Sequence, residues 1–157
     1  MTPEAFDRRV LEWFDGHGPN RRVWVSEIML QQTQVATVMA YYERFMARFP
    51  SLVALADASV DDVLGLWAGL GYYARARHMH EAAQIVRDRH SGELPLDRAL
   101  LEALPGIGRS TAGAILALAA GQRQPILDGN LKRLLARFAA VEGWPGQSQV
   151  LAALWEL

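Results

Sequence analysis

Apolar side chains recur every three or four residues along most of this chain, which is the spacing of one face of an α-helix. Within residues 73–90, for example, Met79, Ala82, Ala83 and Val86 fall on one helical face. No stretch alternates apolar and polar residues with a period of two for long enough to predict a sheet. The pattern therefore predicts an all-α fold.

Capping residues, prolines and glycines mark where the helices should begin and end. Thr2 and Pro3 open the first helix, and Pro50 stops a long stretch that we expect to be bent once. A final helix runs to Leu157 without a stop signal. The predicted helices cover residues 2–14, 23–48, 59–69, 73–90, 100–104, 109–120, 130–141 and 148–157.

Composition excludes several kinds of chemistry. The 157 residues contain no cysteine, which excludes disulfides, thiolate nucleophiles and thiolate-held metal or iron–sulfur sites. Of the 16 basic residues only Lys132 is a lysine, so Schiff-base chemistry has almost no candidate amine. The four histidines form no credible metal cluster, and we predict no metal site. The formal net charge of −1 means that any contact with DNA must come from a local basic patch.

The sequence also lacks the signals of membrane insertion or export. No run of about 18 apolar residues could span a bilayer, and residues 1–9 lack the apolar core of a signal peptide. We therefore expect a cytoplasmic protein.

Glu27 lies within an otherwise apolar stretch, and Gln31 and Gln34 follow on the same helical face. A glutamate that simply faces solvent is the commoner situation in a helix. The bulky neighbours make burial plausible, and burial would raise the pKa of Glu27 and favour its protonated form. The residues alone leave both interpretations open.

Asp128 directly precedes a predicted helix, where an aspartate usually serves as the N-cap. A carboxylate bonded to helix amides stays ionised, because the dipole and the hydrogen bonds lower its pKa. The structural role and a catalytic role are compatible. A protonatable carboxyl group and an ionised one suit cleavage of a glycosidic bond through an oxocarbenium-like transition state.

Two glycine-containing turns could contact nucleic acid. Residues 104–110 join two helices, and the amides at the start of the second helix suit a phosphate group. A plain helix–turn–helix corner explains this spacing equally well. Residues 69–77 combine a glycine hinge with two tyrosines and two arginines, which suits an aromatic wedge with phosphate contacts. A core tyrosine pair beside a solvated arginine face is the alternative.

Taken in order, four segments resemble MutY-type adenine DNA glycosylases of the helix–hairpin–helix superfamily, which are related to endonuclease III. The segments are VWVSEIMLQQTQV, GLWAGLGYYARARHMH, LPGIGRSTAGAIL and PILDGNLKRLLAR. The resemblance implies two helical lobes with the active site in the cleft between them. Residues 21–120 would form a six-helix lobe, and residues 1–20 together with 121–157 the second, truncated lobe.

The same resemblance implies a substrate and a reaction. The family excises adenine mispaired with 8-oxoguanine or guanine in double-stranded DNA, a base-excision repair step that flips the base out of the helix. Glu27 matches the acid that protonates the flipped adenine and helps to activate water. Asp128 matches the residue that stabilises the sugar cation, and Asn130 supports the site. A bacterial monomer associated with the nucleoid is implied.

The implied DNA contacts fall into three groups. Gln32 and Tyr72 enter the duplex, and the hairpin amides hold the DNA backbone. Leu30, Thr33 and Leu70 line the contact that Gln32 and Tyr72 make with the duplex. The hairpin residues are Gly106, Ile107 and Gly108. The third group consists of predicted phosphate contacts, namely Arg75, Arg77, Arg109 and Lys132.

Ser110 indicates the reaction type, because relatives resembling endonuclease III carry a lysine there and cleave the strand through a Schiff base. We therefore expect a monofunctional glycosylase that leaves an abasic site.

Three departures from the family accompany this resemblance. Residues 16–22 stand where the family has a longer segment of the adenine pocket. The four cysteines of the family's 4Fe–4S cluster, expected shortly after Leu157, are absent, and so is the C-terminal domain that helps to recognise 8-oxoguanine. We thus expect no cofactor in this chain. A catalytically impaired DNA-binding fragment of such an enzyme is the alternative.

Overall fold

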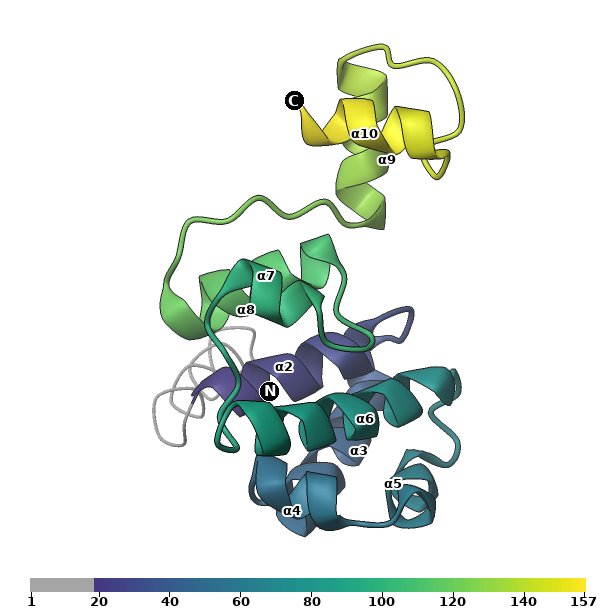
Figure 1. Ribbon diagram of the computed structural model, residues 1–157. Coiled ribbons are helices and arrows are strands. Elements are labelled where there is room, and N and C mark those ends of the chain that lie inside the picture. The colour runs from purple at the N-terminus through teal and green to yellow at the C-terminus, as the bar shows by residue number, and fades with distance from the viewer. Residues whose placement is uncertain (1–18) are drawn as a thin grey trace. The chain divides into compact units, whose positions relative to one another are not determined.

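The computed structural model describes residues 19–157, which are helical with no β-strand in that range (Figure 1). This confirms the all-α prediction, while the helix predicted at residues 2–14 lies outside the described residues. The described helices are α2 (Pro19–Leu30), α3 (Val35–Arg48), α4 (Leu52–Asp57), α5 (Val60–Trp67), α6 (Ala74–Arg89), α7 (Arg98–Glu102), α8 (Arg109–Ala120), α9 (Gly129–Phe138) and α10 (Ser148–Trp155). Within this range no helix is both long and apolar enough to cross a membrane.

The chain divides into two compact units, Met1–Gln124 and Pro125–Leu157, and each is described by itself. The predicted partnership of residues 1–20 with 121–157 stays a prediction, because residues 1–18 lie outside the described range.

Side-chain caps begin several helices where the sequence predicted them. Ser59 accepts a hydrogen bond from the Asp62 amide at 3.1 Å, and Asp97 accepts one from the Leu100 amide at 3.0 Å. Such caps satisfy amides that have no partner inside the helix. Helix α4 was not predicted, because its six residues span fewer than two turns and show no clear period.

The long helix predicted over residues 23–48 is two helices, α2 and α3, separated by residues 31–34. Gln32 within this break has a positive φ of 57°, a conformation that cannot continue a right-handed helix. The predicted bend is therefore a complete break.

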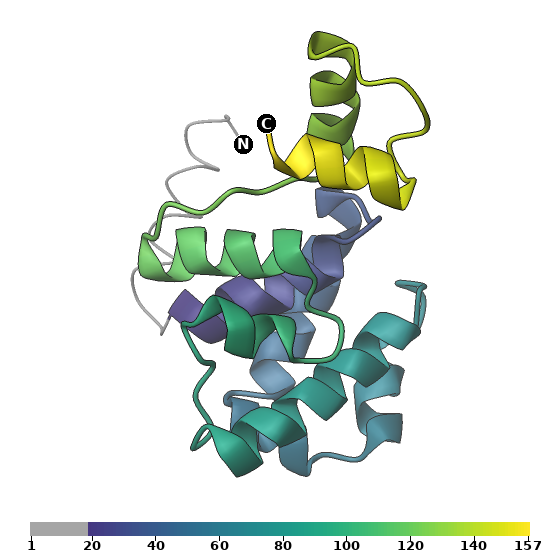
Figure 2. The same ribbon diagram turned by 45° about the horizontal axis from the view of Figure 1, so that its top comes forward.

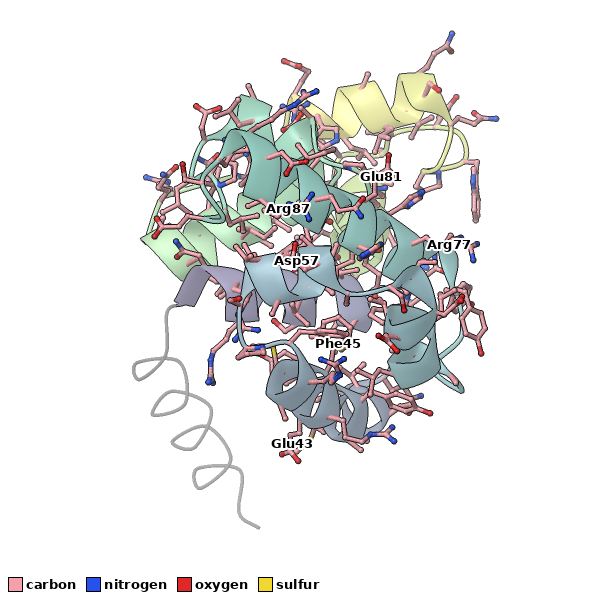
Figure 3. The ribbon with its side chains drawn as sticks, turned by 60° about the horizontal axis from the view of Figure 1, so that its bottom comes forward. Glu43, Phe45, Asp57, Arg77, Glu81 and Arg87 are labelled. Carbon is pink, nitrogen blue, oxygen red and sulfur yellow. The ribbon has the colours of Figure 1, made fainter. Side chains whose placement is uncertain are left out.

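Helix α2 runs through the middle of the first unit and packs against α3, α6 and α8 (Figures 1 and 2). Its residues Trp24 and Met29 are fully buried, so the helix is enclosed rather than amphipathic at the surface. Phe45 from α3 packs edge to face on Trp67 from α5, with ring centroids 6.0 Å apart. Arg87 of α6 forms a 2.7 Å ion pair with Asp57 of α4, and these two side chains lie close together in Figure 3.

The second unit consists of α9 and α10, packed around the small buried cluster Leu127, Ala136, Val150 and Leu154. On its other side α9 leaves Leu134 and Phe138 exposed.

Candidate active site and nucleic-acid interface

Glu27 lies in α2 among the buried side chains of that helix and is itself half-buried. Burial raises the pKa of Glu27 above its ordinary value of 4.5, because the ionised carboxylate loses solvation. The apolar neighbours thus favour the burial interpretation over a solvent-facing glutamate. A carboxyl group in this environment can deliver a proton to a ligand.

One helical turn beyond Glu27, Gln31 connects α2 to the start of α8. Its Nε2 donates a hydrogen bond to Thr111 Oγ1 at 3.3 Å. Helices α2 and α8 also pack directly against each other. The structure therefore brings the helix that carries Glu27 against the helix that follows the predicted hairpin.

The hairpin between α7 and α8 is held from inside the protein and open on its outer side. The Ile107 side chain is buried, and its amide closes the turn by donating to the Leu104 carbonyl at 3.2 Å. Gly106 has a φ of +78°, and a Cβ added there would lie 3.0 Å from His78 Cβ. Gly108, the N-cap of α8, would place an added Cβ in open space. A ligand can thus approach the backbone at Gly108.

The residues just after Gly108 begin α8. Arg109 is exposed, and Ser110 is half-buried at the second position of the helix. A hydroxyl therefore occupies the position where the resemblance implies an amine in strand-cleaving relatives.

Two further turns present the residues predicted to enter DNA. Gln32 lies in the break between α2 and α3, and Tyr72 lies just before α6; both are exposed. Their φ values are 57° and 50°, which L-residues with a side chain adopt at a cost of about 1–2 kcal/mol. Strained backbone of this kind persists only where the surroundings enforce it, and it is concentrated at functional sites.

Arg75 has a different position from the one predicted. Its side chain is buried, and Nη1 donates to the carbonyl oxygens of Ile28, Met29 and Gln31 at 3.0, 2.7 and 2.5 Å. Nη2 donates to Thr33 Oγ1 at 3.0 Å and to the Gly71 carbonyl at 3.3 Å. The guanidinium is therefore already bonded to backbone inside the protein, and a phosphate contact by Arg75 stays a prediction.

The structure also shows the surroundings of three residues predicted to line the DNA contact, Leu70, Leu30 and Thr33. Leu70 is 6% exposed and belongs to the main core, and its role beside the DNA stays a prediction. Leu30 is half-buried against the same core. Thr33 accepts from Arg75 and donates to the Gln31 carbonyl at 3.3 Å, so its hydroxyl is used within the turn. By contrast, Arg77 is exposed on α6 and extends from its outer side (Figure 3).

In the second unit, Asp128 is the N-cap of α9. Its Oδ1 accepts from the amides of Asn130 and Leu131, both at 2.8 Å. Asn130 also accepts from Arg133 through its side-chain oxygen. The N-cap interpretation is confirmed, and both of these bonds end on Oδ1. Half-buried Lys132 lines a hollow together with Arg133 and Arg137 of the same helix and with Trp144 from the loop that follows it.

Sequence reasoning missed the structural role of Arg75 and the link between Gln31 and Thr111. The signal for the first was the spacing from Gly71 to Arg75, because a side chain in the first turn of a helix points back over the preceding loop. The second joins residues 80 positions apart and has no local signature.

The residues present do not fit an iron–sulfur cluster, since residues 1–157 contain no cysteine to ligate the iron. Among residues 19–157 no group of three or more histidine, aspartate or glutamate side chains could hold a metal ion.

The helical fold and the glycine-containing turn between α7 and α8 define a helix–hairpin–helix protein. Residues 25–157 match the family described as HhH-GPD superfamily base excision DNA repair protein, and the chain belongs to this family. The resemblance based on four motifs is thereby confirmed.

Similar proteins of known name include adenine DNA glycosylases. That of Buchnera aphidicola subsp. Acyrthosiphon pisum is 41% identical over all of this chain and 48% of its own. That of Homo sapiens is 48% identical over 98% of this chain and 31% of its own. The chain thus spans about half the length, or less, of these curated relatives.

Solved structures support the fold. A thermostable thymine-DNA glycosylase superposes with a TM-score of 0.77 at 24% identity, covering 92% of this chain and 66% of its own. A non-covalent endonuclease III–DNA complex superposes with a TM-score of 0.73 at 21% identity, covering 99% of this chain and 76% of that one.

Proposed function

We propose that this protein is a monofunctional adenine DNA glycosylase, which hydrolyses the N-glycosidic bond of adenine mispaired with 8-oxoguanine or guanine. The single observation that carries the proposal is the half-buried Glu27, whose pKa burial raises, on a helix packed against the hairpin helix. Curated relatives that cover the whole chain or nearly all of it are named adenine DNA glycosylases, which supports the same substrate.

The proposed reaction assigns one task to each carboxyl group. Protonated Glu27 gives its proton to a ring nitrogen of the extruded adenine, and the bond between the base and C1′ breaks with its electron pair leaving on the base. The carboxylate of Asp128 stabilises the positive charge that develops on the sugar. Water then adds to C1′ and returns a proton to Glu27, which gives free adenine and an abasic site.

The proposed partner is double-stranded DNA containing A:8-oxoguanine or A:G. The proposed contacts with its phosphate groups are the outward-facing backbone at Gly108 and the exposed side chains of Arg77 and Arg109. Half-buried Lys132 is a further proposed contact. We also propose that this chain acts as a monomer and that its own residues hold no cofactor.

The test is single-turnover incubation with 30-base-pair duplexes containing adenine opposite 8-oxoguanine, guanine or thymine, followed by alkaline cleavage of abasic sites. We expect excision opposite 8-oxoguanine and guanine and little opposite thymine. Glu27→Gln should lower the rate about 10²-fold or more, whereas Glu43→Gln, which alters an exposed glutamate of α3, serves as the matched control. Tight binding without release of adenine would instead identify a catalytically impaired DNA-binding fragment.

A further inference from the structure

Arg75 donates hydrogen bonds to one backbone carbonyl in each of two surface turns. In each turn, the residue that follows this carbonyl has a positive φ. Nη1 bonds the carbonyl of Gln31, and the next residue, Gln32, has a φ of 57°. Nη2 bonds the carbonyl of Gly71, and the next residue, Tyr72, has a φ of 50°. One guanidinium thus contacts the peptide group before each left-handed residue.

This contact bears directly on the two φ angles. The carbonyl of one residue and the amide of the next share one rigid plane, so rotation about the following N–Cα bond turns that carbonyl relative to the side chain. A hydrogen bond that fixes the direction of the carbonyl therefore restricts φ of Gln32 or Tyr72. The left-handed conformation is otherwise unfavourable by about 1–2 kcal/mol for each of these residues.

The guanidinium is itself held firmly enough to serve this purpose. Its carbon lies 5.5 Å from the ring centroid of Trp67, a fully buried residue, and 5.3 Å from that of Tyr72. The carbonyls of Ile28 and Met29 at the end of α2 accept from the same Nη1. Trp67 Nε1 also donates to the Gly71 carbonyl at 3.0 Å, which fixes that peptide from a second direction. The planar fork of an arginine can bond both turns at once, whereas a lysine amine is a single point.

We propose that Arg75 is a positioning residue that holds Gln32 and Tyr72 together in their left-handed conformations, so that both side chains enter the base stack of a DNA duplex as one rigid wedge. The proposal rests on the proposed function for its ligand, duplex DNA. Its structural part concerns this chain alone. The exposed side chains of Gln32 and Tyr72 are what the duplex meets, and Arg75 acts through them without touching DNA.

The first experiment needs no DNA. Amide hydrogen exchange is measured by mass spectrometry on peptides covering residues 30–35 and 69–74 in wild type, Arg75→Lys and Arg89→Lys. Arg89 is an exposed arginine at the other end of α6, so its replacement matches the chemical change. We expect faster exchange in both peptides for Arg75→Lys only. Unchanged exchange in either peptide would overturn the proposal.

The second experiment reads base extrusion with 2-aminopurine at the target position of the duplex. We expect Arg75→Lys to slow the fluorescence rise and the single-turnover rate on the order of 10²-fold, as for other misplaced reacting groups. The slope of log affinity against log salt should stay that of wild type. A slope smaller by about one unit with normal extrusion would mean a phosphate contact and would overturn the positioning role.

A second variant covers the case that Arg75→Lys does not fold, and the exchange experiment separates failure of the positioning role from failure of the proposed function. If Arg75→Lys does not fold, Thr33→Val removes one acceptor of the guanidinium, and we expect the same changes at smaller size; exchange equal to wild type at residues 30–35 would count against the proposal. If the wild-type chain excises no adenine, the proposed function fails, while the exchange experiment still decides whether Arg75 holds both turns.

Discussion

Gln31 donates a hydrogen bond from Nε2 to Thr111 Oγ1 across 3.3 Å, joining the end of α2 to the first turn of α8. The helix that carries Glu27 is thereby tied to the helix that follows the hairpin. The carbonyl of the same Gln31 accepts from Arg75, so one residue links the hairpin helix to the turn that presents Gln32.

Removing the Thr111 hydroxyl should weaken this connection. We expect Thr111→Val to lower the free energy of unfolding by about 1 kcal/mol, the usual net value of one hydrogen bond. Urea denaturation measures this change. Thr37→Val, at an exposed position of α3, is the control and should change stability by less than about 0.5 kcal/mol. Equal effects of the two substitutions would mean that the link contributes nothing.

The raised pKa of Glu27 predicts opposite effects on stability and activity. Because burial destabilises its carboxylate, the fold loses stability as pH rises from the ordinary pKa of 4.5 through the raised folded pKa. Glu27→Gln should therefore be more stable than wild type at pH 7 and equally stable at pH 3, while excision is lost. Wild-type excision should fall as pH rises past the folded pKa. Denaturation curves at the two pH values and a pH–rate profile measure both effects; a less stable Glu27→Gln protein at pH 7 would contradict this reading.

The two hairpin glycines should respond differently to alanine. Gly106→Ala forces a side chain to a φ of +78° and 3.0 Å from His78 Cβ, so we expect a loss of about 1–2 kcal/mol in stability. Gly108→Ala meets no atom of the protein within 4 Å. Its stability should change by less than about 0.5 kcal/mol, while affinity for duplex DNA falls because the methyl group obstructs approach to the backbone. Unfolding and DNA titration measure both; unchanged affinity of Gly108→Ala would argue against a backbone contact there.

Ser110 predicts base removal without strand cleavage. Borohydride should trap no covalent adduct between the wild-type chain and substrate DNA, since a hydroxyl forms no Schiff base. Ser110→Lys introduces an amine at the second position of α8 and should yield a trapped adduct visible on a denaturing gel. Lys132→Arg is the control for the single native lysine. Wild-type trapping that disappears in Lys132→Arg would mean that Lys132 supplies an amine.

Asp128 combines a structural role with a proposed catalytic one, and two substitutions separate them. Asp128→Ala removes an N-cap that bonds two amides and should cost α9 about 1 kcal/mol. Asp128→Asn retains a good capping oxygen but no charge, so stability should hold while excision drops about 10²-fold or more. Circular dichroism with urea and single-turnover assays measure the two effects. Normal excision by Asp128→Asn would remove the charge from the mechanism.

Local sequence signals predicted most of the helices because the signals are themselves local. The hydroxyl of Ser59 and the carboxylates of Asp97 and Asp128 cap helices within three residues of their own position, so no distant contact is needed. The break at residues 31–34 was harder to predict. No glycine or proline marks it, and the positive φ of Gln32 accompanies hydrogen bonds to Arg75, which lies 44 positions beyond Gln31.

The candidate site likewise has features that the sequence predicts and features that depend on distant contacts. The sequence alone identified the candidate residues Glu27, Ser110 and Asp128, the absence of cysteine and the four family motifs. These are properties of residue type and spacing, so no tertiary contact is needed to recognise them. Only the tertiary structure decided which side chains are buried. Arg75 and Leu70 both lie beside Tyr72 in the sequence and both read as surface residues of a DNA-facing loop. Packing instead places Leu70 in the core and Arg75 against the carbonyls at the end of α2, because the last carbonyls of an enclosed helix find hydrogen-bond donors elsewhere in the fold.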